Sequence, residues 1–208
     1  MTDMLQVEGL NVSFPSRDGP VRVVRDVTFT LGRERLGIVG ESGSGKSQTG
    51  RAILGLTPAS ATVTADKLSF DGIDLRHASA KTWRSLRGPR MSMIMQDPKY
   101  SLNPVMTVGR QIVEAYRRRG DATRTDARNR AVAMLEAVQI RDPERVFEAY
   151  PHELSGGMGQ RAMIAMMLIA EPDLLIADEV TSALDVTVQL DVLRILDGLV
   201  RDRGMGLI

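Results

Sequence analysis

One eight-residue segment limits the possible folds more than any other part of this 208-residue sequence. It reads Gly-Glu-Ser-Gly-Ser-Gly-Lys-Ser at residues 40–47, after an apolar run at 35–40 and before a helix predicted at 47–56. Its glycines let backbone N–H groups turn inward, and the start of the helix adds partial positive charge. The sequence therefore predicts a phosphate-binding loop between a buried strand and a helix. The alternative is a glycine-rich turn that binds no ligand.

The last residues of this loop have defined chemical tasks. Lys46 can reach the β- and γ-phosphates of a nucleotide, and the Ser47 hydroxyl can ligate Mg²⁺. The residues expected to form the nucleotide-binding loop are Gly40, Glu41, Ser42, Gly43, Ser44, Gly45, Lys46, Ser47 and Gln48.

A second motif is an apolar strand that ends in two carboxylates. Residues 174–177 read Leu-Leu-Ile-Ala and are followed by Asp178 and Glu179. Because ligands bind beyond the carboxyl ends of parallel strands, we expect Asp178 to hold Mg²⁺ and Glu179 to orient or deprotonate an attacking water. Such a pair alone is often a solvated strand end or a helix cap. Together with the loop it defines a P-loop nucleoside triphosphatase, a class that includes kinases, GTPases and recombinases.

The rest of the pattern predicts an α/β protein. Apolar strands alternate with helices, which favours a mainly parallel sheet. Asp71-Gly72, between residues 67–70 and 73–75, predicts a tight hairpin. The other expected strands are 21–31, 91–95 and a beginning at 206–208; the expected helices lie within 98–147 and at 155–170 and 186–200.

Composition narrows the function classes. The net charge of +1 gives no electrostatic reason to expect nucleic acid, and the absence of cysteine excludes disulfides and thiolate metal sites. The longest apolar run, 162–170, is far shorter than the ~20 residues of a spanning helix, and the start does not resemble a signal peptide. A membrane role is therefore expected only through a partner. One basic cluster is interpreted as a solvated helix face: Arg117, Arg118, Arg119, Arg124, Arg128 and Arg130.

Residues 154–161, Leu-Ser-Gly-Gly-Met-Gly-Gln-Arg, indicate a family. Ser155 is a good N-cap, and the two glycines expose backbone donors at a second anion-binding helix start. Placed shortly before the acidic strand, the stretch resembles the signature motif of ABC transporter ATP-binding subunits; a plain helix cap is the alternative. The resemblance implies that two subunits pack head to tail. Ser155 and Gly157, with Gly156 between them, would then contact ATP bound to the partner.

The same resemblance implies further site residues. Gln96 matches the glutamine that touches Mg²⁺ and the water, and Asp185 belongs to a segment that crosses the dimer interface. Phe14 stands where the family has an aromatic that stacks on adenine, although an ordinary core phenylalanine is the alternative. The implied cofactors are ATP and Mg²⁺. The implied catalytic residues are Glu179, Lys46 and Gln96, and the implied metal ligands are Ser47, Gln96 and Asp178.

Longer stretches resemble the ATPases of oligopeptide and dipeptide importers, some relatives of which carry nickel or other small solutes. These stretches are 40–48, 96–98 with 101–104, 150–153 and 183–189. The resemblance implies a subunit that couples ATP hydrolysis to peptide import at the cytoplasmic face of the cell membrane. Its implied partners are a second ABC ATPase subunit, integral-membrane permease subunits and, indirectly, an extracytoplasmic solute-binding protein, with no nucleic acid. An ABC ATPase acting on nucleic acid or ribosomes and a non-catalytic interaction subunit are the alternatives.

The implied fold is a P-loop NTPase (RecA-like) core with a mainly parallel sheet, an N-terminal antiparallel β-subdomain and an inserted helical subdomain. Residues 1–208 are expected to form a single nucleotide-binding domain whose last strand is incomplete. Within it, 1–96 and 163–208 are assigned to the β-subdomain and ATP-binding core. Residues from about 97 to 162 are assigned to the helical subdomain with the signature motif.

Several positions depart from the family pattern. Val180 stands in place of a usual proline, Met95 in place of a common phenylalanine, and Gly159 in place of a polar residue, at about 1 kcal/mol of helix propensity. The family continues with a further strand and a switch histidine, which His77 and His152 do not match. We therefore expect a fragment or a truncated product that binds ATP weakly and hydrolyses it poorly by itself.

Overall fold

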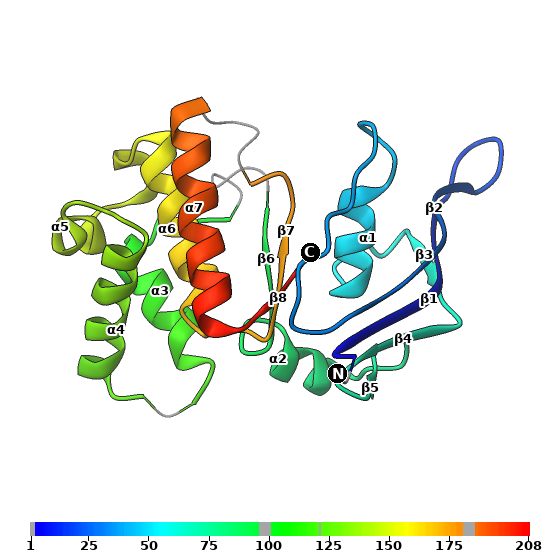
Figure 1. Ribbon diagram of the computed structural model, residues 1–208, viewed down its shortest axis with the longest axis horizontal. Coiled ribbons are helices and arrows are strands. Elements are labelled where there is room, and N and C mark those ends of the chain that lie inside the picture. Colours follow the sequence, from blue (N-terminus) through cyan, green and yellow to red (C-terminus); the bar gives the residue numbers. More distant parts are fainter. Residues whose placement is uncertain (1–2, 96–100, 121, 181–185) are drawn as a thin grey trace. The chain divides into compact units, whose positions relative to one another are not determined.

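The computed structural model describes residues 3–95, 101–120, 122–180 and 186–208 (Figure 1). The chain divides into two compact units, Met1–Arg87 with Gly206–Ile208, and Gly88–Met205. The division at about 97 and 162 that the family resemblance implies stays a prediction.

The first unit is built on an antiparallel sheet. Its strand order is β2-β1-β4-β5, and β3 pairs with β1 beyond this path. The strands are β1 (Leu5–Phe14), β2 (Val21–Leu31), β3 (Thr62–Thr64), β4 (Lys67–Phe70) and β5 (Ile73–Asp74). This unit also contains the helices α1 (Lys46–Ile53) and α2 (Ala80–Leu86) and the short strand β8 (Gly206–Leu207).

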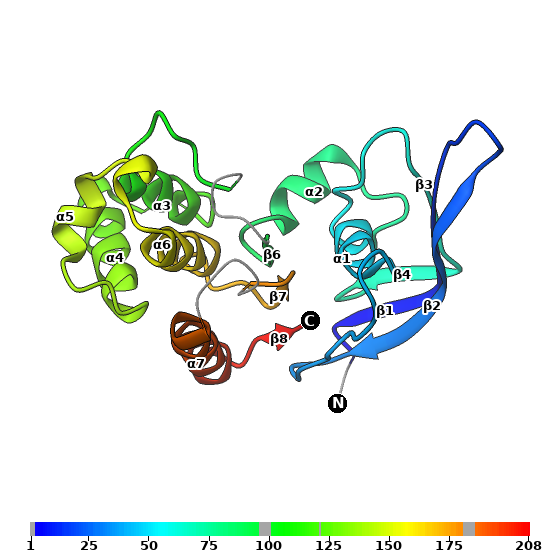
Figure 2. The same cartoon turned by 90° about the horizontal axis from the view of Figure 1, so that it is seen from above.

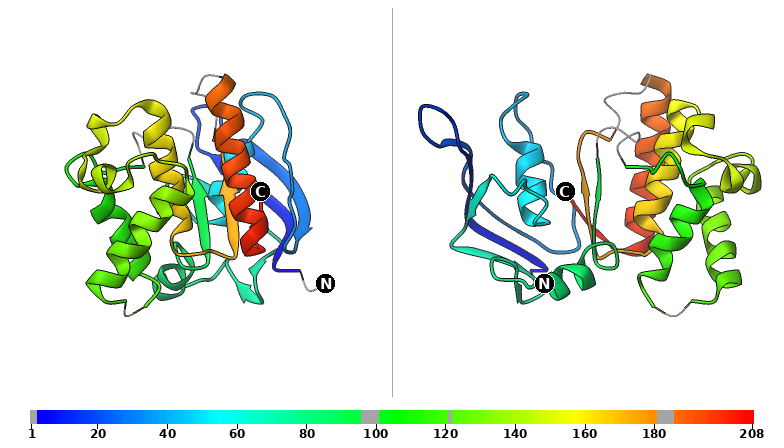
Figure 3. Two further views of the ribbon diagram at one scale, coloured as in Figure 1. Left: turned by 60° about the vertical axis from the view of Figure 1, so that its left-hand side comes forward. Right: turned by 180° about the vertical axis from the view of Figure 1, so that it is seen from behind.

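Helix α1 lies beside β1 and β2 (Figure 3). The strands contribute side chains such as Leu5, Leu10 and Val24, and α1 contributes Ile53, all of them buried. Burial of such side chains stabilises a fold by about 1.5–3 kcal/mol each relative to exposure. The packing fixes the helix that follows the predicted phosphate-binding loop.

The predicted hairpin at residues 67–75 is confirmed. Ser69 pairs with Asp74 and Phe70 pairs with Ile73. The two turn residues, Asp71 and Gly72, have φ angles of 49° and 77°, the positive values that a tight primed turn requires.

The prediction of a strand at residues 35–40 is wrong, because the structure has no strand there. Arg35 makes only an isolated parallel bridge with Leu207, and the following residues are assigned to no strand. Ile38 and Val39 are 38% and 96% exposed. An apolar run becomes a buried strand only when neighbouring strands cover it. Within the first unit, the described chain places beside this run only the two-residue strand β8, at the position where a strand was expected to begin.

The second unit combines a parallel strand pair with a group of helices. β6 (Met91–Ile94) and β7 (Leu174–Ala177) pair from Met91 opposite Leu174 to Ile94 opposite Ala177. The predicted strands at 91–95 and 174–177 are therefore confirmed. The helices are α3 (Val108–Arg117), α4 (Arg124–Ala137), α5 (Pro143–Glu148), α6 (Gly156–Leu168) and α7 (Val186–Arg203), with a short 3-10 turn at Pro151–Glu153.

Helix α6 is central to the second unit. It contacts α3, α4, α7 and β6, and Figure 2 shows it between the α3–α5 group and α7. Ala162, Met163, Ile164 and Leu168 are all fully buried, so the apolar run at 162–170 is a core helix. None of the described helices is long and apolar enough to cross a membrane.

Candidate nucleotide-binding site

The predicted phosphate-binding loop surrounds the ammonium group of Lys46. Lys46 Nζ donates to the carbonyl oxygens of Gly40 at 2.8 Å and Glu41 at 2.9 Å. Gly45, with φ 97°, is the N-cap of α1, and no side chain caps this helix end. Backbone N–H groups at an uncapped helix start attract anions. The segment thus has the form of a loop that wraps a cation next to an anion-attracting helix start.

Close contacts restrict the side chain that two glycine positions of this loop could carry. A Cβ on Gly45 would lie 2.4 Å from the carbonyl oxygen of Val23 in β2, so the loop rests directly on the sheet. A Cβ on Gly40 would lie 2.7 Å from Ser44 Oγ. The Val23 oxygen belongs to the backbone and cannot move aside, so position 45 requires glycine, whereas a Cβ at position 40 would force the Ser44 hydroxyl to rotate away.

The loop offers polar groups suited to a polyphosphate. Glu41, Ser42 and Ser44 are exposed. In the first turn of α1, Gln48 Oε1 is buried and, among the described residues, meets no hydrogen-bond partner. Buried polar atoms are normally paired, so this one indicates a missing partner such as a bound molecule or water.

Phe14, the expected adenine-stacking residue, is the last residue of β1. It pairs with Val21 and is only partly buried, outside the hydrophobic core of the first unit. Its position in the same unit as the loop is compatible with a contact to a base. Stacking on adenine stays a prediction.

The acidic pair lies at the end of β7 in the second unit. The Asp178 backbone N–H donates to the Ile94 carbonyl at 2.9 Å, which continues the β6–β7 pairing by one bond. Glu179 follows with φ 47°, a left-handed conformation that non-glycine residues rarely adopt, and it is exposed. The carboxyl end of a parallel strand therefore presents two carboxylates, as predicted.

The signature stretch forms the N-terminus of α6. The Ser155 side chain accepts from the Met158 backbone N–H at 3.4 Å, and Gly156 and Gly157 form the first helical positions. The predicted N-cap and helix start are confirmed. Ahead of it, His152 stacks on Tyr150 with 5.7 Å between ring centroids, in agreement with the structural role expected for this histidine.

One contact in this unit has no counterpart in the sequence analysis. Gln160, 1% exposed in α6, donates from Nε2 to the carbonyl oxygen of Val180 at 2.5 Å. A carboxamide that reaches a backbone carbonyl twenty residues away follows no periodic pattern. The sequence feature that could have drawn attention to it is a polar glutamine in the signature stretch, just ahead of the apolar run at 162–170.

The predicted site residues are thus divided between the units. The loop at 40–48 and Phe14 belong to the first, and Ser155–Gly157, Asp178 and Glu179 belong to the second. Gln96 and Asp185 lie outside the described residues.

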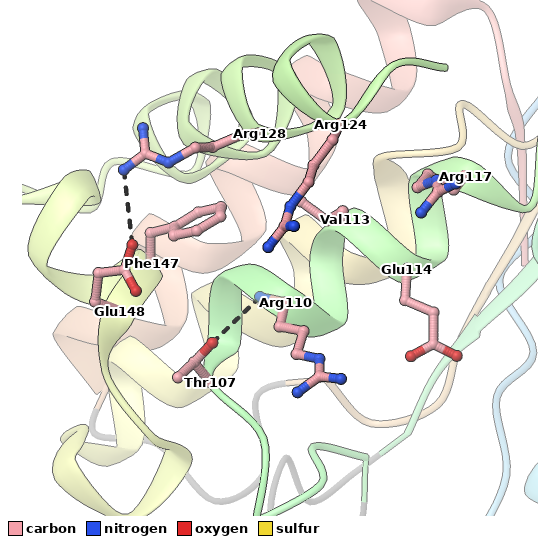
Figure 4. A pocket seen from close by; sticks show the side chains of 9 residues that line it. All are labelled: Thr107, Arg110, Val113, Glu114, Arg117, Arg124, Arg128, Phe147 and Glu148. Atoms are coloured by element: carbon pink, nitrogen blue, oxygen red, sulfur yellow. Dashed lines mark hydrogen bonds and ion pairs between the residues drawn. The ribbon is translucent and has the colours of Figure 1, made fainter. Parts of the chain in front are cut away.

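A groove of about 810 Å³ lies among α3, α4 and α5 (Figure 4). Arg117 and Arg124 line it, and the Arg128 guanidinium lies 4.9 Å from the Phe147 ring centroid. The basic cluster was interpreted as one solvated face. Arg117, Arg118 and Arg124 are exposed, in agreement with that interpretation.

Several arginines of the cluster make ion pairs with glutamates of other segments. Arg128 pairs with Glu144 at 2.8 Å, and Arg119 and Arg130 pair with Glu171 at 2.8 and 3.1 Å. These last two bonds tie α4 and the segment after α3 to Glu171, three residues beyond the end of α6. Part of the basic cluster is therefore structural.

Comparison with known proteins assigns the family. A family model described as ABC transporter matches residues 24–182, which is most of the sequence. The chain therefore belongs to the ABC transporter family, and the resemblance drawn from residues 154–161 is confirmed.

Two curated relatives are similar over the whole chain. The dipeptide transport ATP-binding protein DppD of Bacillus subtilis (strain 168) is 46% identical over 210 residues, which cover 100% of this chain and 63% of that protein. The glutathione import ATP-binding protein GsiA of Escherichia coli O1:K1 / APEC is 46% identical over 213 residues, which cover 99% of this chain and 34% of that protein. The chain thus spans less than two thirds of the length of these relatives.

A solved structure agrees with the fold. The ATP-binding cassette MJ0796, in a dimeric post-hydrolysis state bound to ADP and Pi, matches with a TM-score of 0.85 and 22% sequence identity over 98% of this chain and 86% of that chain. The predicted fold class is confirmed: a P-loop NTPase fold with an antiparallel β-subdomain, a parallel strand pair and helices.

Proposed function

We propose that this chain is the ATP-binding, ATP-hydrolysing part of an ABC importer of the peptide class, bound to the cytoplasmic face of the membrane through its permease. The observation that carries the proposal is the loop that encloses Lys46, in front of a helix with no side-chain cap. The relatives named for dipeptide transport and glutathione import support the cargo class, because dipeptides and glutathione are both short peptides.

The loop at residues 40–48 binds the triphosphate in this proposal. Phosphate oxygens are stronger acceptors than peptide carbonyls, so Lys46 exchanges its bonds to Gly40 and Glu41 for bonds to the β- and γ-phosphates. The N–H groups of the loop and of the first turn of α1 add to the attraction. This arrangement holds the reacting phosphorus in place, which is the main contribution that a protein makes to phosphoryl transfer.

Mg²⁺ fits the donors that this chain offers. Among the residues that the structure describes, no group of three or more His, Cys, Asp or Glu side chains could hold a metal by itself. Mg²⁺ is usually held by one or two protein oxygens together with water and substrate phosphates. Ser47 and Asp178, with Gln96, would hold it. When bound, it neutralises charge on the β- and γ-phosphates.

Glu179 is the proposed general base. Its carboxylate accepts a proton from water while the water oxygen bonds to the γ-phosphorus, and the bond from that phosphorus to the bridging oxygen of ADP breaks. The products are ADP and inorganic phosphate. The position directly after β7 keeps the carboxylate exposed, where a substrate water can reach it.

A second subunit completes the site in this proposal. Ser155 and Gly157 at the start of α6 contact the γ-phosphate of ATP bound to the partner, and Asp185 lies at the dimer interface. The dimeric state of the MJ0796 cassette supports this arrangement. The further partners are the permease subunits and, through them, an extracytoplasmic solute-binding protein.

The test is Lys46→Ala in the assembled transporter. Binding of a fluorescent ATP analogue should weaken at least tenfold, which corresponds to about 1.4 kcal/mol. ATP-driven uptake of a dipeptide into vesicles should stop. Unchanged nucleotide binding would refute the assignment of the loop, whereas normal ATP hydrolysis without dipeptide uptake in the wild type would refute the cargo class alone.

A further inference from the structure

Two backbone contacts enclose Glu179. Before it, the Asp178 N–H donates to the Ile94 carbonyl at 2.9 Å. After it, the Val180 carbonyl accepts from Gln160 Nε2 at 2.5 Å. Gln160 is 1% exposed and Val180 6% exposed, so this second bond is closed to solvent. All four residues belong to the unit Gly88–Met205.

The backbone of Glu179 needs such support. Its φ of 47° lies in the left-handed region, which costs a non-glycine residue about 1–2 kcal/mol. Residues persist in that region only where the surrounding structure holds them. The pairing with β6 fixes the residue before Glu179, and the Gln160 side chain fixes the residue after it.

We propose that Gln160 is a positioning residue for Glu179. Its carboxamide fixes the Val180 carbonyl and thereby the direction in which the Glu179 carboxylate leaves the end of β7. The inference rests on the proposed function, because it assigns Glu179 the role of general base. It adds a residue that acts on Glu179 through the neighbouring backbone.

The same bond connects two parts of the proposed site. Gln160 lies in the second turn of α6, the helix that begins with Ser155 and the signature glycines. A displacement at the start of α6 therefore reaches the backbone next to Glu179 through one buried hydrogen bond. Small misplacements of a reacting group are costly, since an error of about 1 Å can reduce a rate about a hundredfold.

Gln160→Met is the informative change, because methionine has a similar length and packs well but cannot donate. We expect kcat for ATP hydrolysis in the assembled transporter to fall at least about tenfold, while the affinity for ATP stays within about threefold. Gln111→Met is the matched control. Gln111 is also a buried glutamine of this unit, 7% exposed, and donates from Nε2 to the carbonyls of Asn103 and Met106. The control should lose stability and keep kcat within about twofold.

Gln160→Asn is a second variant in case the methionine variant does not fold. It keeps the amide but is one methylene shorter, so its donor falls short of Val180, and it should also lose kcat without losing ATP affinity. In a Glu179→Gln background, adding either Gln160 change should cause little further loss of kcat, because a residue that acts only through Glu179 has no effect once that carboxylate is removed.

Three results would overturn the inference. One is a kcat in both Gln160 variants equal to that of Gln111→Met, and another is a full, roughly tenfold loss when Gln160→Met is added to Glu179→Gln. The third is a loss of ATP affinity as large as the loss of kcat, which indicates general damage to the fold. A wild-type transporter that binds ATP without hydrolysing it would instead refute the proposed function, and this inference with it.

Discussion

The carbonyl oxygen of Val23 in β2 lies directly behind Gly45, so closely that a Cβ on Gly45 would stand 2.4 Å from it. The predicted phosphate-binding loop is therefore positioned by the sheet beneath it as well as by its own glycines. The contact joins a strand and a loop more than twenty residues apart in the sequence. It makes the loop sensitive to a single added methyl group.

Gly45→Ala should disrupt nucleotide binding. The methyl group meets Val23, and the φ of 97° is strained for any residue with a side chain, for a combined cost above about 2 kcal/mol. Binding of fluorescent ATP should weaken at least tenfold. Gly19→Ala is the control, because Gly19 has φ 105° but no atom within 4 Å of its Cβ position. If both variants bound ATP equally well, the loop would not depend on its contact with β2.

Gly109→Ala should destabilise the second unit. A Cβ on Gly109 in α3 would lie 2.2 Å from the Phe147 ring in α5, so the helices must separate or the ring must move, at about 1–3 kcal/mol. Gly198→Ala in α7 meets nothing within 4 Å and should stabilise by up to about 1 kcal/mol through helix propensity. Urea unfolding of the two variants measures the difference. A Gly109→Ala variant as stable as wild type would contradict the close α3–α5 packing.

Glu171→Gln should destabilise the protein in a pH-dependent manner. Burial raises the pKa of Glu171, but the hydrogen bond from Arg119 and the charges of Arg203 and Arg130 outweigh it, so the net pKa is below its usual value. A lowered carboxyl pKa stabilises the fold above the unfolded pKa of about 4.3, and this contribution is lost as pH falls through the folded pKa. The variant should therefore lose about 1 kcal/mol at pH 7.

The loss caused by Glu171→Gln should shrink as the pH falls below about 4.3 and through the lower pKa of the folded state. Glu136→Gln, an exposed position on α4, is the matched control and should change stability little at either pH. Urea unfolding at several pH values separates the two. A loss that stays constant with pH would show that the charge of Glu171 does not stabilise the fold.

Local patterns predicted several elements to the residue. The strand at 174–177 matches β7 because four apolar residues stand between Asp173 and Asp178. The hairpin of β4 and β5 follows from Asp71-Gly72, and the start of α6 from the N-cap at Ser155. In each case the deciding interaction lies within a few residues, so the sequence carries the information locally.

Elements that depend on distant neighbours were harder to predict. In β1 the alternation of buried and outward-facing side chains buries Val7, changes phase at Gly9 and then buries Leu10 and Val12. The register of the pairing between β1 and β2 shifts in this region, and Gly9 has φ 60°. This change of phase interrupts the two-residue period, and residues 5–14 were not assigned as a strand. The prediction of a strand at 35–40 was wrong for the opposite reason. Its apolar pattern indicates a buried strand whether or not neighbouring strands are present to cover it.

In the candidate site, too, local motifs were predictable and a long-range contact was not. Motif spacing located Lys46, Asp178, Glu179 and the signature helix. The bond from Gln160 to the Val180 carbonyl escaped prediction, because it depends on how α6 packs beside the end of β7. The roles of Gln96 and Asp185 stay predictions.

ATP hydrolysis with Glu179 as the proposed general base is tested most directly by phosphate release from the Glu179→Gln transporter, with ATP binding measured in the same samples. Loss of a general base should reduce turnover at least about 100-fold. The affinity for ATP should stay within about threefold, because the phosphate-binding loop is unchanged. Turnover equal to that of the wild type would contradict the role of Glu179 as general base. A wild-type transporter that releases no phosphate would contradict ATP hydrolysis itself.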